Sequence, residues 1–84
     1  SAFYGTALQT LLHQLAVKKL IITGIAGNIC VLFTANDAYM REYRLYCPAD
    51  CIASASQEDN RYALTMMKNV LKAETIPQDE ISFT

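Results

Sequence analysis

The chain has 84 residues, of which 52% are hydrophobic and 18% charged, and a formal net charge of −1, which predicts one soluble globular unit. Its seven Lys and Arg residues are spread among eight Asp and Glu residues without a basic run, which excludes nucleic-acid binding and attraction to an anionic membrane surface. The longest apolar run, residues 29–33, is too short to cross a bilayer, and the sequence opens without a signal-peptide pattern, so we expect a cytoplasmic protein.

The first part of the chain predicts a helix and a buried strand. Thr6 is suited to cap a helix over residues 7–16, where apolar residues recur every three or four positions. This apolar set is Leu8, Leu11, Leu12, Leu15 and Ala16. Residues 20–23 form a near-continuous apolar run, as expected for a strand covered on both faces in a parallel sheet.

A glycine-marked turn at residues 24–27 leads into a second predicted helix over residues 29–42. Asn28 is suited to cap this helix. Asp37 and Arg41 are spaced to pair one turn apart on its wetter side. The expected apolar stripe is Val31, Ala35, Ala38 and Tyr39.

The remainder predicts two more strands and a third helix. Residues 44–47 read as a strand that ends at Pro48, because proline removes a ladder donor. Ser56 is suited to cap a helix over residues 57–72, and residues 73–76 are a candidate third strand. The expected apolar set of this helix is Tyr62, Leu64, Met66, Met67, Val70 and Leu71.

Helices that alternate with strands predict an α/β fold with right-handed crossovers and a parallel sheet. Such a sheet needs helices on both faces, which makes a three-layer α/β/α sandwich with a Rossmann-like sheet. A unit of this size buries only about two thirds of its chain surface. We therefore expect residues 1–84 to be the C-terminal portion of a larger domain, with a short, poorly held tail from Pro77 onward.

The three cysteines, Cys30, Cys47 and Cys51, do not resemble the dense disulfide framework of a small secreted protein. Free cytosolic thiols fit better. Cys47 and Cys51 have a C-x3-C spacing, which leaves a redox pair or a zinc site as weaker alternatives, but no further cysteine lies close in sequence. The only histidine, His13, falls in a separate helix, where we expect an ordinary polar position and no metal site.

Cys30 stands where an apolar strand runs through a turn into a predicted helix. At a helix N-terminus, unpaired backbone N–H groups and the positive end of the helix dipole favour the thiolate, which is the nucleophilic form. Free cysteine is also among the most buried residue types. From position alone, a small buried apolar residue therefore remains the alternative.

Four segments form a wider pattern. Residues 1–6 resemble an S-A-F-x-G-T segment, and residues 23–31 resemble a nucleophile loop of the form T-G-(V/I)-A-T-N-x-C-V. Residues 35–44 resemble the A-x-D-A-x and G-Y-x-V stretch that follows this loop, and residues 48–50 resemble a P-x-D turn. Over roughly residues 1–67, the chain resembles the isochorismatase-like cysteine hydrolases, which include nicotinamidases and N-carbamoylsarcosine amidohydrolases.

This resemblance implies the isochorismatase-like hydrolase fold and a covalent mechanism that needs no cofactor. Cys30 corresponds to the nucleophile, and the backbone N–H groups of Ala26 and Cys30 would form the oxyanion hole. A cis peptide bond would fall between Ile25 and Ala26 and would turn the Ala26 N–H toward the substrate oxygen. Phe3 would line the substrate pocket, although a plain core role for this ring is equally open.

The chain also departs from the family pattern. Gly27 stands where Thr or Ala is usual, which predicts a looser loop or a larger pocket. The family's catalytic Asp lies on the first strand and its Lys lies a few residues before S-A-F, and this chain contains neither. Asp37 and Asp50 match positions that look structural. Because positioned acid–base groups contribute about 100- to 10,000-fold, we expect the chain alone to be inactive.

The leading hypothesis is a cysteine hydrolase that acts on a small amide, so its expected partner is a small-molecule substrate. Homo-oligomers are common in the family, and the sequence leaves the oligomeric state of this chain open. Two other classes remain. One is a catalytically idle relative or oligomerisation subunit. The other is a phosphate-binding α/β module in which residues 24–27 cradle the anion, although the chain lacks the G-x-G-x-x-G fingerprint. The sequence does not identify the substrate.

Overall fold

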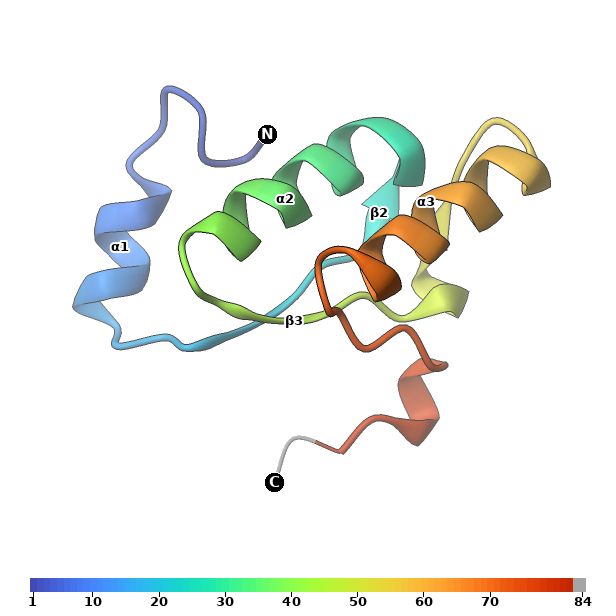
Figure 1. Cartoon of the computed structure of the whole chain (residues 1–84). Helices are drawn as coiled ribbons and strands as arrows, with labels where there is room; N and C mark the ends of the chain where they lie inside the picture. Colours follow the sequence, from blue (N-terminus) through green and yellow to red (C-terminus); the bar gives the residue numbers. More distant parts are fainter. Residues whose placement is uncertain (83–84) are drawn as a thin grey trace.

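The computed structural model describes residues 1–82. In chain order the elements are α1 (Leu8–Gln14), β1 (Lys19–Ile21), β2 (Gly24–Ile25), the π-helical turn η1 (Gly27–Val31), α2 (Leu32–Met40), β3 (Arg44–Tyr46), the 3-10 turn η2 (Ala49–Cys51), β4 (Ile52–Ala53), α3 (Gln57–Asn69) and the 3-10 turn η3 (Gln78–Glu80). The α2 and α3 helices lie side by side above the strands, and α1 lies at one end of the molecule (Figure 1). The chain is thus a mixed α/β fold, as predicted.

All the strand pairs are parallel, which confirms the predicted strand direction. β1 pairs with β3, so that Leu20 lies opposite Leu45, and β2 pairs with β4. The predicted third strand, residues 73–76, is reduced to one parallel bridge between Glu74 and Tyr46. β2 and β4 were not predicted, because two-residue strands leave no periodic pattern in a sequence.

The cap predicted at Thr6 is confirmed in part, because the Thr6 hydroxyl accepts the Leu8 N–H at 3.4 Å. α1 begins at Leu8, after Ala7, which makes no side-chain cap hydrogen bond. The Thr6 hydroxyl also donates to the Ala2 carbonyl at 2.6 Å, within the N-terminal segment. Of the five predicted apolar positions only Leu12 is buried, and Leu11 and Leu15 are 49% and 63% exposed.

α3 follows its prediction at its start and departs from it along its length. The Ser56 hydroxyl accepts the Asp59 N–H at 3.1 Å, which confirms the cap. The helix ends at Asn69, earlier than predicted; its buried residues are Ala63 and Met67, and Leu71 just after its end is also buried. Tyr62 and Val70, predicted to be apolar contacts, are 64% and 50% exposed. Met67 and Leu71 are therefore confirmed as buried positions, whereas the predicted set missed the small Ala63, which faces the core in place of Tyr62.

The tail is better held than predicted. The Gln78 N–H donates to the Asp50 carboxylate at 2.9 Å, which ties η3 to η2. Residues 83–84 of the predicted tail lie outside the described residues. Over residues 1–82 no helix is long and apolar enough to cross a membrane.

Candidate active site

Cys30 lies in the η1 turn that leads from β2 into α2. The turn is π-helical, so both the Ile29 and the Val31 N–H groups donate to the Ala26 carbonyl at 3.1 Å. The predicted cap at Asn28 is therefore wrong, since the turn begins after Ala26 and makes no side-chain cap bond. Val31 is buried, whereas Cys30 is exposed, so the turn is anchored on one side and presents the thiol on the other. Single π-helical turns of this kind recur at functional sites.

Ala26 and Cys30 are the residues whose backbone N–H groups the family resemblance implies as the oxyanion hole. Ala26 comes directly before the η1 turn, and Cys30 lies within it. The peptide bond between Ile25 and Ala26 is cis. Ala26 itself is extended, with φ −95° and ψ 137°. Among residues 1–82 the Ala26 N–H makes no hydrogen bond, so this donor is free to bind an oxygen beside Cys30.

A cavity of about 390 Å³ lies beside Cys30. Leu8 and Leu12 of α1 form one wall, and Leu20 and Ile22 form another. The polar side chains that line it, besides Cys30, are those of Thr23 and Thr34. An apolar cavity with a few polar groups is typical of a small-molecule site.

Phe3 belongs both to the cavity wall and to the core. Its side chain is 5% exposed and lines the cavity. The ring stacks on Tyr43 with centroids 6.2 Å apart, and the Arg41 guanidinium lies 4.8 Å from the ring centroid. The Ala2 N–H donates to the Thr34 hydroxyl at 3.0 Å, which ties the N-terminal segment to α2 and keeps Phe3 in place.

No charged side chain lines this cavity in the described part of the chain. Asp37 pairs with Arg41 at 3.6 Å, which confirms the predicted ion pair, and Asp50 accepts the Gln78 N–H. Neither carboxylate reaches the thiol's cavity. His13 is exposed and pairs with Gln9 at 2.8 Å, as suits an ordinary polar position. Within residues 1–82 no three His, Cys, Asp or Glu side chains cluster as a metal site requires.

The other two cysteines lie outside the cavity, and all three thiols are free. Cys47 is fully buried, and burial raises the pKa of its thiol to about 11, because desolvation disfavours the charged form. Cys51 donates to the Asp50 carboxylate at 3.7 Å. Partial desolvation and this neighbouring carboxylate raise the pKa of the Cys51 thiol. Both residues are thereby disfavoured as thiolates at neutral pH.

Alkylation with iodoacetamide at about pH 8 should therefore modify Cys30 in the native protein and leave Cys47 untouched. Three pH units below its pKa, only about one Cys47 thiol in a thousand is ionised, and burial also blocks the reagent. Peptide mapping by mass spectrometry gives the site of modification. Unfolding in urea should expose Cys47 to the reagent, and its modification at the same rate in the native protein would contradict this account.

Gly27, the first residue of η1, faces the protein interior and not the cavity beside Cys30. A Cβ atom at this position would lie 2.6 Å from Asn60 Oδ1, 2.6 Å from Ile52 Cγ2 and 2.9 Å from Ser54 Oγ. The space of a side chain is therefore already occupied, so the expected enlargement of the pocket is wrong.

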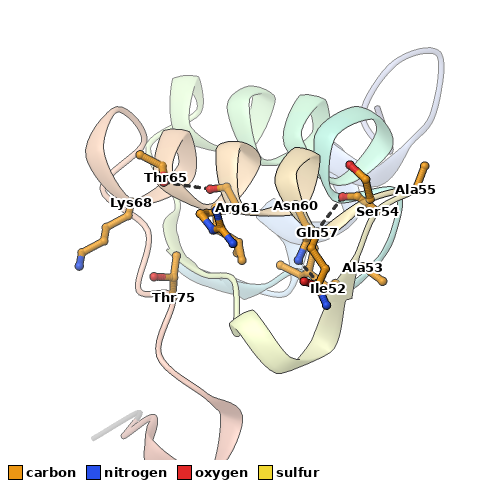
Figure 2. A pocket seen from close by; sticks show the side chains of 12 residues that line it. Ile52, Ala53, Ser54, Ala55, Gln57, Asn60, Arg61, Thr65, Lys68 and Thr75 are labelled. Carbon is orange, nitrogen blue, oxygen red and sulfur yellow. Dashed lines mark hydrogen bonds between the residues drawn. The ribbon is translucent and has the colours of Figure 1, made fainter.

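A second cavity, of about 610 Å³, lies between α3 and the segment that contains β4 (Figure 2). Ile52, Ser54 and Asn60, which pack against Gly27, also line this cavity. It does not include Cys30. Sequence reasoning gave no signal for it, because its residues come from the loop after β4, one face of α3 and Thr75.

Comparison with known proteins identifies relatives of this chain. The isochorismatase domain model matches residues 1–79. The isochorismatase family protein YaaI of Bacillus subtilis, whose own role is uncharacterised, is 69% identical over 81 residues, which cover 96% of this chain and 45% of that protein.

Two solved structures are similar in both fold and sequence. The pyrazinamidase/nicotinamidase of Streptococcus mutans superposes with a TM-score of 0.88 at 42% identity, over 90% of this chain and 42% of that one. The N-carbamoylsarcosine amidase of Thermoplasma acidophilum superposes with a TM-score of 0.85 at 30% identity, over 98% of this chain and 46% of that one. The chain thus spans less than half the length of these relatives.

Proposed function

Because this chain belongs to the isochorismatase family, we propose that it forms the nucleophile-bearing portion of a cysteine hydrolase that cleaves a small amide. The observation that carries this proposal is the exposed Cys30 thiol on a π-helical turn, beside a mainly apolar cavity and close in sequence to the unpaired N–H of Ala26. A nucleophile, an oxyanion donor and a cavity for the substrate then occur together.

The proposed reaction has two steps. The Cys30 sulfur bonds to the amide carbonyl carbon, and the oxygen takes on negative charge, which the N–H groups of Ala26 and Cys30 stabilise. The C–N bond then breaks, the nitrogen leaves with a proton as ammonia or an amine, and a thioester remains on Cys30. Water next attacks the thioester carbon, which releases the carboxylic acid and restores the thiol.

This reaction needs a proton acceptor that the described cavity does not contain. We propose that an Asp and a Lys from an N-terminal portion of the domain complete the site, and that residues 1–84 are the C-terminal portion. Two observations support this: no charged side chain lines the cavity of the described residues, and the relatives are more than twice as long as the matched region.

The substrate class follows from the cavity and from the relatives. A volume of about 390 Å³ with apolar walls and two threonine hydroxyls suits a small uncharged molecule with an amide group. The two similar structures are a pyrazinamidase/nicotinamidase and an N-carbamoylsarcosine amidase. We therefore propose nicotinamide and small carbamoyl compounds as the first substrates to test.

The test compares the 84-residue chain with a chimera in which the N-terminal portion of Bacillus subtilis YaaI is joined ahead of Ser1. Release of ammonia from nicotinamide and a panel of small amides is the measurement. We expect turnover by the chimera and a rate at least about 100-fold lower for the chain alone, since it lacks positioned acid–base groups. Equal turnover by both would show that the base lies within residues 1–84, and no turnover by a folded chimera on any amide would overturn the proposed activity.

A further inference from the structure

Asn60 of α3 joins three segments that surround the turn carrying Cys30. Its Nδ2 donates to the Ile52 carbonyl of β4 at 3.2 Å, and its Oδ1 accepts the Ser54 hydroxyl at 2.8 Å (Figure 2). β4 in turn pairs with β2, the strand that leads into the turn. Both hydrogen bonds are partly buried, so their loss is not fully replaced by water.

The same side chain packs directly against the start of the turn. Asn60 Oδ1 lies 2.6 Å from the place where a Cβ atom of Gly27 would be, and Ile52 and Ser54 close the rest of that space. Real Cβ atoms essentially never come this close to another heavy atom. Gly27 and Asn60 are therefore complementary, because the missing side chain of one makes room for the amide of the other.

We propose that Asn60 is a positioning residue for the Cys30 turn. This inference rests on the proposed role of Cys30 as nucleophile. Asn60 touches neither Cys30 nor its cavity, and acts by holding Gly27 and β4 in place. The turn is only five residues long, so a shift at Gly27 moves the backbone N–H groups relative to the sulfur. Misplaced donors lose much of their effect on a developing negative charge.

The test measures the alkylation rate of Cys30 by iodoacetamide as a function of pH in the 84-residue protein, with peptide mapping to isolate the signal of Cys30. We expect Asn60→Ala to slow alkylation at neutral pH by about threefold or more and to move the rate–pH curve to higher pH, because the thiolate loses well-placed N–H groups. The matched control is Asn69→Ala, at an exposed position of the same helix, and its curve should superpose on that of the unmodified protein.

Ser54→Ala is the milder second variant, because it removes one of the two hydrogen bonds and keeps the amide against Gly27. It should move the curve in the same direction by a smaller amount, and it covers the case in which Asn60→Ala fails to fold. Superposable curves for folded Asn60→Ala, or for Ser54→Ala if only that variant folds, would overturn the inference. A different outcome separates the two proposals. If the rate–pH curve of the unmodified protein equals that of a simple thiol while the curves of the variants still shift, the result counts against Cys30 as the nucleophile and leaves the positioning role of Asn60 standing.

Discussion

Substitution of Cys30 by alanine in the N-terminally extended chimera should lower kcat/KM for amide hydrolysis by about 1,000-fold or more. The sulfur is the only atom proposed to bond to the substrate, and removal of a nucleophile from such a site costs nearly the whole covalent pathway. Because Cys30 is exposed, truncation at Cβ leaves no buried void, so the variant should fold as the parent does. Steady-state kinetics with the most active amide, together with a thermal melt, provide the measurement.

Cys51→Ala is the matched control, since this thiol lies outside the cavity. It should keep kcat/KM within about twofold of the parent value, as is usual for a substitution away from the site. Cys30→Ser adds a chemical test: its hydroxyl fits the site but is a far weaker nucleophile at neutral pH, so it should be nearly as inactive as Cys30→Ala. Hydrolysis that survives in a folded Cys30→Ala protein would exclude covalent catalysis by this residue.

Gly27→Ala should destabilise the protein by about 1–3 kcal/mol, the usual cost of forcing an extra methyl group into a packed interior. Two of the three atoms that the new Cβ would meet cannot easily move away. Ile52 Cγ2 is bonded to Cβ and so lies close to the backbone, and the Asn60 side chain is held by two hydrogen bonds. Urea unfolding followed by circular dichroism measures the free energy. For a domain of this size, each kcal/mol corresponds to a fall of about 4–8 °C in the melting temperature.

Gly5→Ala separates this steric effect from the general cost of replacing a glycine. A Cβ atom at Gly5 would meet nothing within 4 Å, but its φ of +66° is unfavourable for alanine. Its expected cost is about 1–2 kcal/mol and arises from the backbone alone. Gly27→Ala, whose φ is not in this region, should in addition slow Cys30 alkylation, whereas Gly5→Ala should not. A Gly27→Ala protein as stable as the parent would show that the turn can move aside.

The features that the sequence predicts correctly are those that depend on neighbours along the chain. The Ser56 cap and the Asp37–Arg41 pair each involve residues three or four positions apart, so local spacing was sufficient. The buried Val31, Ala35 and Ala38 likewise follow from helical periodicity, whereas Tyr39, predicted for the same stripe, is 42% exposed. The parallel direction of the strands follows from the alternation of helices and strands.

Two wrong predictions concern the η1 turn, where the backbone geometry of the turn and its packing against other segments override the local pattern. Asn28 looks like a cap, but the Ala26 carbonyl accepts two N–H groups and the chain forms a π-helical turn instead. Gly27 looks like a source of looseness, but atoms from residues 25 to 33 positions further along the chain fill its space. No local pattern reports such packing, because it exists only once α3 and β4 have come together over the turn.

The hydrogen bond from Ala2 to Thr34 has a practical consequence for the proposed assembly. Both residues line the cavity beside Cys30, so polypeptide joined ahead of Ser1 emerges at the rim of that cavity. A sphere with the cavity's volume of about 390 Å³ is about 9 Å across, and three extended residues span about 10 Å. If a lysine lies a few positions upstream of Ser1, as proposed, its side chain would need no long spacer to reach the thiol, so a split or chimeric enzyme is best joined at this point.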